Sequence, residues 1–124
     1  MIISNGQFDK FVEESFAVLP EEIKSKMNNV AILVDDEPTP EQIKKVKLKP
    51  GVLLFGLFEG VGQSRRINYG PILPDRITLF RKAILSRCQT EEEVKNQITS
   101  TLKHEIAHHF GSDEVGARKA SGKK

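Results

Sequence analysis

The sequence predicts a single domain of the α+β class over residues 1–124, and three observations lead to that class. With 124 residues the chain has the usual length of one domain. Short apolar runs at 30–34, 52–58 and 77–83 have the length and composition of β-strands. Two longer stretches, 8–19 and 94–106, repeat apolar residues at helical spacing and predict amphipathic helices.

The first part of the chain predicts two helices, a strand and a short helix. The helix at 8–19 ends before a proline, and a second helix follows at 20–27 with two glutamates in its first turn. The run at 30–34 is apolar at every position, so we expect a strand covered on both faces at the centre of the sheet. After a turn with two prolines, residues 41–47 predict a short helix whose apolar residues point inward.

Two further strands are predicted on either side of a loop. In the strand at 52–58, Gly56 marks a bulge or a close approach of the backbone to another element. The loop at 59–74 contains five glycines or prolines, and such loops often border functional sites. In the strand at 77–83 apolar residues alternate with others, so one face is expected to be less buried and the strand to lie at an edge.

A long helix is predicted near the C-terminus. Thr90 and Glu93 have the spacing of a capping box, and Gly111 suits the closing residue of the helix. The basic residues at 115–124 predict a frayed tail. One apolar stripe runs along the helix and consists of Val94, Ile98, Leu102 and Ile106.

Charge and composition exclude several classes of protein. The 19 basic and 17 acidic residues give a net charge of only +2, so we expect no nucleic-acid partner, and the lysines at 44–49 are interpreted as a solvated face. One cysteine, Cys88, allows no internal disulfide and is interpreted as structural. The N-terminus lacks the pattern of an export signal and the longest apolar run is far too short for a bilayer, so a cytoplasmic protein without a membrane span is expected.

The long helix carries HEIAH at 104–108, which is the HExxH pattern. Helical spacing brings the imidazoles of His104 and His108 to nearly the same face, one turn apart, where they can bind one ion. Zinc accepts imidazole nitrogen at about 2.0–2.1 Å and keeps an open position for water when it is catalytic. Glu105 lies beside that face and is expected to act as the general base toward the metal-bound water.

The residues after this motif predict a third ligand. They extend the pattern to HExxHxxGxxE, in which Gly111 permits a sharp turn that returns a ligand to the ion. This spacing favours Glu114, and the adjacent Asp113 is the alternative. His109 is rotated by about 100° from its neighbour on the helix and is interpreted as a partly exposed or hydrogen-bonded histidine.

At these residues the sequence resembles the minimal zincin-like, or matrix-metalloprotease-like, metallopeptidases of bacteria, whose motif is similar to HEIAHHFG followed by an acidic pair. The resemblance implies a compact α+β core with a small mixed sheet, an edge strand above the active-site helix, and zinc held by two histidines and an acidic residue. No methionine follows the motif, so the resemblance is to a minimal zincin and not to a metzincin. The same order of segments continues upstream in LPEEI at 19–23, NVAILVDDEP at 29–38, LLFGLFEG at 53–60 and LPDRITLFR at 73–81.

Motif and resemblance together predict a zinc-dependent peptidase, expected to be a monomer, that acts on a peptide or protein. The alternative is a non-catalytic zinc-binding interaction module, although a purely structural site has no need of a base such as Glu105. Tyr69 in the loop is a further candidate for contact with the substrate. The substrate is expected to lie extended along a strand edge formed by Ile77, Thr78, Leu79 and Phe80.

Overall fold

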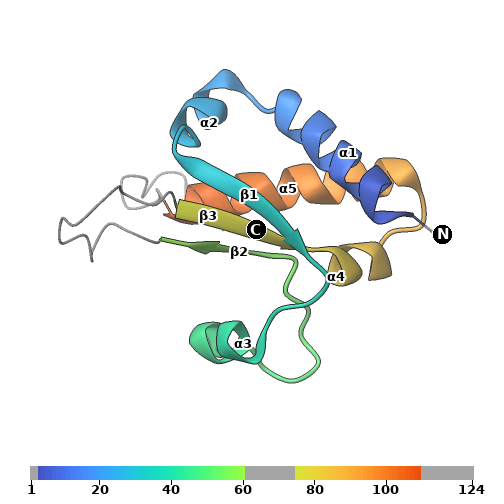
Figure 1. The fold of residues 1–124 in the computed structure, drawn as a ribbon, viewed down its shortest axis with the longest axis vertical. Helices are drawn as coiled ribbons and strands as arrows, with labels where there is room; N and C mark the ends of the chain where they lie inside the picture. The colour runs from blue at the N-terminus through green and yellow to red at the C-terminus, as the bar shows by residue number, and fades with distance from the viewer. Residues whose placement is uncertain (1–2, 61–74, 110–124) are drawn as a thin grey trace, which may run out of the picture.

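The structure is a computed structural model, and it describes residues 3–60 and 75–109. Figure 1 shows α1 beside α5 on one side of the strands, and α3 apart from the other helices. None of the helices in these ranges is long and apolar enough to cross a membrane. The elements are α1 (Asn5–Ala17), α2 (Glu21–Lys26), β1 (Val30–Asp35), α3 (Pro40–Val46), β2 (Gly56–Glu59), β3 (Asp75–Phe80), α4 (Arg81–Ser86) and α5 (Glu91–His109).

The three strands form one mixed sheet in the order β1-β3-β2. β1 is parallel to β3, with Ile32 opposite Ile77, and β2 is antiparallel to β3, with Phe58 opposite the same Ile77. The strand β2 also packs against α5. The prediction of an α+β domain with a small mixed sheet and an edge strand over a long helix is therefore confirmed.

Two predictions about the position of individual strands are wrong. The apolar run at 30–34 forms an edge strand, in which Leu33 is 44% exposed, and not the centre of the sheet. The central strand is β3, which ends at Phe80 because the chain turns into α4 instead of continuing extended to Ala83. Both faces of β3 are covered, since four consecutive residues are at most 2% exposed: Ile77, Thr78, Leu79 and Phe80.

The core lies between the sheet and the helices α1 and α5. The predicted apolar stripe of α5 is confirmed, because its four members are at most 2% exposed. Each such side chain contributes about 1.5–3 kcal/mol through burial of apolar area. The predicted cap of α5 is half confirmed: the hydroxyl of Thr90 accepts from the Glu93 N–H at 3.1 Å, but the Glu93 carboxylate accepts from the N–H of Gln89 at 2.7 Å and not from Thr90.

Gly56 allows β2 to lie against α5. A Cβ atom at this position would lie 2.6 Å from Cγ2 of Thr101 on α5 and 3.3 Å from the carbonyl oxygen of Thr78 on β3. The predicted close approach of the backbone is therefore confirmed. The strand begins at this glycine and not at residue 52, and Val52 and Leu53 before it are exposed.

Candidate metal centre

The two histidines of the HExxH pattern lie on an exposed part of α5. The imidazole rings of His104 and His108 are stacked with their centroids 5.4 Å apart and an angle of 17° between their planes. Neither ring is buried, so an ion from solvent can reach both. This pair of nitrogen donors, one helical turn apart, suits zinc, which takes three protein ligands at a catalytic site.

The third ligand cannot be assigned from the described part of the chain. Within residues 3–60 and 75–109 no group of three or more His, Cys, Asp or Glu side chains is placed to hold one ion. The predicted ligand Glu114 and its alternative Asp113 lie outside these residues, as do Gly111, Tyr69 and the tail at 115–124. Both ligand assignments therefore stay predictions.

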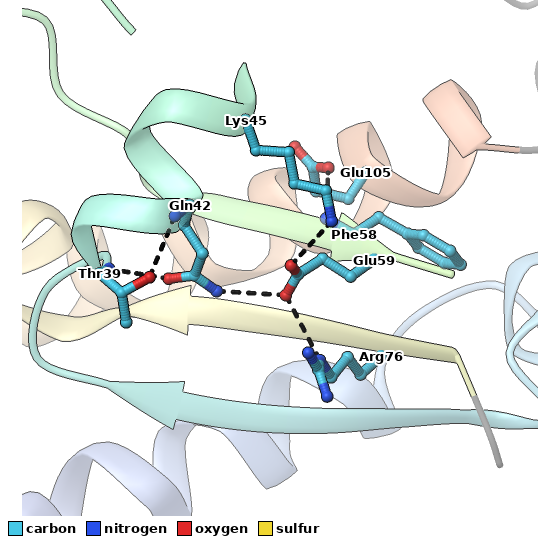
Figure 2. Close-up of polar contacts among 7 residues, drawn as sticks. All are labelled: Thr39, Gln42, Lys45, Phe58, Glu59, Arg76 and Glu105. Atoms are coloured by element: carbon cyan, nitrogen blue, oxygen red, sulfur yellow. Dashed lines mark hydrogen bonds and ion pairs between the residues drawn. The ribbon is translucent and has the colours of Figure 1, made fainter. Parts of the chain in front are cut away.

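Glu105 is half-buried and faces the edge strand. Its Oε1 accepts a hydrogen bond from the backbone N–H of Phe58 in β2 at 3.1 Å, as Figure 2 shows. Burial raises the pKa of the Glu105 carboxyl above its ordinary value, while the charge of His104, the Phe58 N–H and the charge of His108 oppose part of this rise. A carboxylate with a raised pKa is a better proton acceptor at neutral pH.

A cavity of about 260 Å³ lies beside His104 and Glu105. One wall is the chain that leads into β2, and the other is the side of α5 that faces it. The cavity therefore adjoins His104, Glu105 and the first residue of the edge strand. Its lining residues are Leu53, Leu54, Phe55 and Gly56 on the strand side and Gln97, Ser100 and Thr101 on the helix.

The predicted substrate edge at residues 77–80 is wrong. Ile77, Thr78, Leu79 and Phe80 lie in β3, which has β1 on one side and β2 on the other. Their backbone groups are therefore already used within the sheet and cannot receive an extended peptide by strand addition. The described edge strand that lies next to α5 is β2, because the long helix packs against it.

His109 is directed toward the sheet. Its ring stacks on Phe58 with the centroids 3.6 Å apart, and its Nε2 lies 4.0 Å from Oδ2 of Asp75. The side chain is 35% exposed, which agrees with the predicted partly exposed histidine. The C-terminal end of α5 thus contacts the first residue of β3 and the edge strand β2.

Two contributors to this region had no signal in the sequence, the backbone of Phe58 and the carboxylate of Glu59. Both belong to β2: the Phe58 N–H reaches Glu105 only because the sheet brings that strand to α5, while the side chain of the adjacent Glu59 is bonded to α3 and to Arg76. Cys88 contributes nothing comparable: it is buried, and burial together with the charge of Glu93 raises the pKa of its thiol. The interpretation of Cys88 as structural fits this environment.

Comparisons with known proteins agree with the fold. The model of a family described as zincin-like metallopeptidases matches residues 27–120. A structure described as a conserved hypothetical protein from Thermo thermophilus superposes with a TM-score of 0.56 at 19% sequence identity, covering 98% of this chain and 100% of that chain. At this identity the likeness concerns the fold alone. A search of curated proteins gave no match.

Proposed function

The chain belongs to the zincin-like metallopeptidase family, and from this premise we propose that it hydrolyses peptide bonds with a zinc ion held by His104 and His108 and with Glu105 as the general base. The third ligand in this proposal is Glu114, with Asp113 as the alternative. When bound, zinc supplies a Lewis acid that polarises the scissile carbonyl and acidifies water. The chain's own residues then have to position and move the proton.

The observation that carries the proposal is the place of Glu105 between the histidine pair and the edge strand. It precedes His108 by less than one turn, and its carboxylate points to β2, where Phe58 donates to it. A structural zinc site has no use for a half-buried carboxylate beside its ligands. A carboxylate at this place can take a proton from the attacking water and give it to the leaving amine.

We propose that the peptide lies extended along β2. Among the described strands it pairs with β3 alone, and its N-terminal end borders the cavity of about 260 Å³ beside His104 and Glu105. A strand edge binds an extended chain through main-chain hydrogen bonds, and a neighbouring pocket receives one side chain. The Phe58 N–H is already bonded to Glu105, so the peptide would use the other outward main-chain groups of β2. Because both polar and apolar residues line the cavity, we expect it to receive a substrate side chain of medium size that has an apolar part and a polar group.

The test is cleavage of a peptide library by the zinc-loaded full chain, with products identified by mass spectrometry. The proposal expects cleavage that a chelator abolishes and that added zinc restores. The matched control is Glu105→Gln, which keeps the shape of the side chain but removes the base. Zinc bound at about one ion per chain without cleavage of any library member would favour the non-catalytic module.

A further inference from the structure

The carboxylate of Glu59, the last residue of β2, joins three elements on the side of the sheet away from α5. A Cβ at Gly56 would meet Thr101 of α5 and the Phe58 ring stacks on His109 of α5, so Glu59 points to the other face, because successive residues of a strand alternate between faces. Its side chain is 8% exposed. Figure 2 shows its three donors: Gln42 Nε2 at 3.1 Å and Lys45 Nζ at 3.2 Å, both from α3, and Arg76 Nε at 3.3 Å from β3.

These contacts keep the carboxylate ionised despite its burial. Burial by itself raises the pKa of Glu59, but the hydrogen bonds from Lys45 and Gln42 and the charges of Lys45 and Arg76 outweigh it, so the pKa lies below the ordinary value. The two cations are 59% and 43% exposed, which means that each reaches inward from the rim to the carboxylate. A buried carboxylate that is bonded on both oxygens has little freedom to move.

The donor from Gln42 is itself oriented by the first turn of α3. The hydroxyl of Thr39 accepts from the N–H of Gln42 at 3.0 Å, and Oε1 of Gln42 accepts from the N–H of Thr39 at 2.9 Å. The amide therefore has its oxygen on the helix cap and its nitrogen on Glu59. Through this arrangement α3 is anchored to the end of β2.

The neighbouring residue, Phe58, donates its N–H to Glu105 at 3.1 Å. In the four-residue strand β2, Phe58 thus holds the Glu105 carboxylate of α5. The next residue, Glu59, is held by α3 on the opposite face of the sheet. The end of a short strand is its least restrained part, even in a strand such as β2 that pairs with β3 and packs on α5. The contacts of Glu59 therefore act together with the pairing to β3 and the stacking of Phe58 on His109 in fixing the place of the Phe58 N–H.

We propose that Glu59 is a positioning residue: the contacts that Lys45, Gln42 and Arg76 make with its carboxylate fix the end of β2 so that the Phe58 N–H holds Glu105 in place. The proposal rests on the proposed function only in treating Glu105 as the base. The action of Glu59 is transmitted through the backbone of β2, and its described partners do not include the histidine pair. The geometric part of the proposal holds with or without a peptide substrate.

The experiment measures the Phe58 amide by ¹⁵N–¹H NMR and hydrogen exchange in the full chain. In Glu105→Gln the Phe58 amide proton loses its charged acceptor. The chemical shift of Phe58 in this variant is the reference for a broken contact. In Glu59→Gln the Phe58 resonance is expected to move toward that position and its exchange to become faster by about ten- to a hundredfold, the range for one lost hydrogen bond to a charged group. The chemical shifts of the buried α5 amides, such as that of Leu102, are expected to stay unchanged.

Glu41→Gln is the matched control, because Glu41 is an exposed glutamate of α3 that lines the same side of the network. It removes an equal charge and is expected to leave the Phe58 amide unchanged. If Glu59→Gln does not fold, Lys45→Met removes one donor from α3 without altering the sheet, and a smaller shift in the same direction is expected. An unchanged Phe58 amide in every folded variant of the network overturns the proposal, and so does a Phe58 amide that Glu105→Gln fails to move.

A cleavage assay separates this inference from the proposed function. If the wild type cleaves a peptide, Glu59→Gln is expected to lower kcat while KM and the zinc content stay near those of the wild type. Equal loss of zinc and of activity would mean a general structural role and would contradict positioning. If the wild type cleaves nothing, the proposed function fails, and the Phe58 amide still decides whether Glu59 positions Glu105.

Discussion

The backbone N–H of Phe58 donates to the carboxylate of Glu105 at 3.1 Å, and through this bond the edge strand of the sheet meets the HExxH helix. The two residues are 47 positions apart in the sequence. The contact places the expected base next to the strand that we propose binds the peptide. Five predictions test the proposed metal site and the contact between β2 and α5. They concern the proposed metal ligands, the proposed base Glu105, the buried carboxylate of Glu59 and the packing of β2 on α5.

The first prediction concerns zinc binding. His104→Ala and His108→Ala are each expected to lose the ion, because a single imidazole leaves too few protein ligands for zinc. His109→Ala is the matched control and is expected to keep it, since that ring is stacked on Phe58. Elemental analysis of the purified variants gives the zinc content, and full occupancy in His108→Ala would contradict the assignment.

The second prediction separates the two candidates for the third ligand. Glu114→Ala is expected to weaken zinc binding more than Asp113→Ala, because two residues between the glycine and the acid match the spacing that returns a ligand to the ion. The measurement is a competition titration with a chromophoric chelator. A larger loss in Asp113→Ala would make that aspartate the ligand.

The third prediction concerns the base. Glu105→Gln is expected to keep zinc and to lower the cleavage rate by about 10² to 10⁴, the usual contribution of a general base. Single-turnover kinetics on any peptide that the wild type cleaves provide the rate. Cleavage at the wild-type rate by the zinc-loaded variant would remove Glu105 from the mechanism while leaving the metal site intact.

The fourth prediction concerns the pH dependence of stability from Glu59. Its pKa is lowered in the folded state, since its hydrogen bonds and cations outweigh the effect of burial. The stabilisation is therefore complete above the ordinary glutamate pKa of about 4.3 and is lost as the pH falls through the lower folded value. Urea denaturation is expected to find Glu59→Gln less stable than the wild type by about 1.5–3 kcal/mol at neutral pH.

This difference is expected to shrink in acid, because the wild-type carboxylate becomes protonated and loses its charged contacts. Glu41→Gln, which changes an exposed glutamate, is expected to follow the wild type at every pH. A gap between Glu59→Gln and the wild type that stays constant from neutral pH to about pH 3 would show that the charge of Glu59 is not what stabilises the contact.

The fifth prediction concerns the packing of β2 on α5. Gly56→Ala is expected to cost about 1–3 kcal/mol, because the added methyl meets Cγ2 of Thr101 at 2.6 Å and the neighbours must shift. Thr101→Ser removes that methyl and keeps the hydroxyl, so the double variant is expected to recover part of the loss.

Gly6→Ala is the matched control, since nothing lies within 4 Å of a Cβ at that helical glycine. It is expected to be neutral or slightly stabilising. The free energies come from urea denaturation of the wild type and of each variant. A double variant no more stable than Gly56→Ala would mean that the clash with Thr101 is not the cause.

Local features of the site could be predicted from the sequence. The helical spacing of His104 and His108, the apolar stripe of α5 and the capping residue Thr90 depend on neighbours within about four positions along the chain, and helix geometry is the same in every fold. The close approach at Gly56 was one of two alternatives that the sequence left open, because a glycine within an apolar run marks either a bulge or a close approach of another backbone.

The order of the strands was decided by the tertiary structure. The run at 30–34 is more continuously apolar than the run at 77–80, yet the first became the edge and the second the centre. The pattern of apolar residues indicates whether the two faces of a strand are covered. It does not indicate whether the strand pairs with one other strand or with two. Strand pairing joins residues far apart in the sequence, so no local signal contains it.

What the sequence by itself determined is the placement of two imidazoles one helical turn apart on α5, with Glu105 beside them. What only the tertiary structure decided is the surroundings of that carboxylate, which are the N–H of Phe58 in front of it and the Glu59 network behind the strand. The reason is physical. A helix fixes its own side chains through bonds between near neighbours, whereas an edge strand reaches a helix only after the whole sheet has assembled.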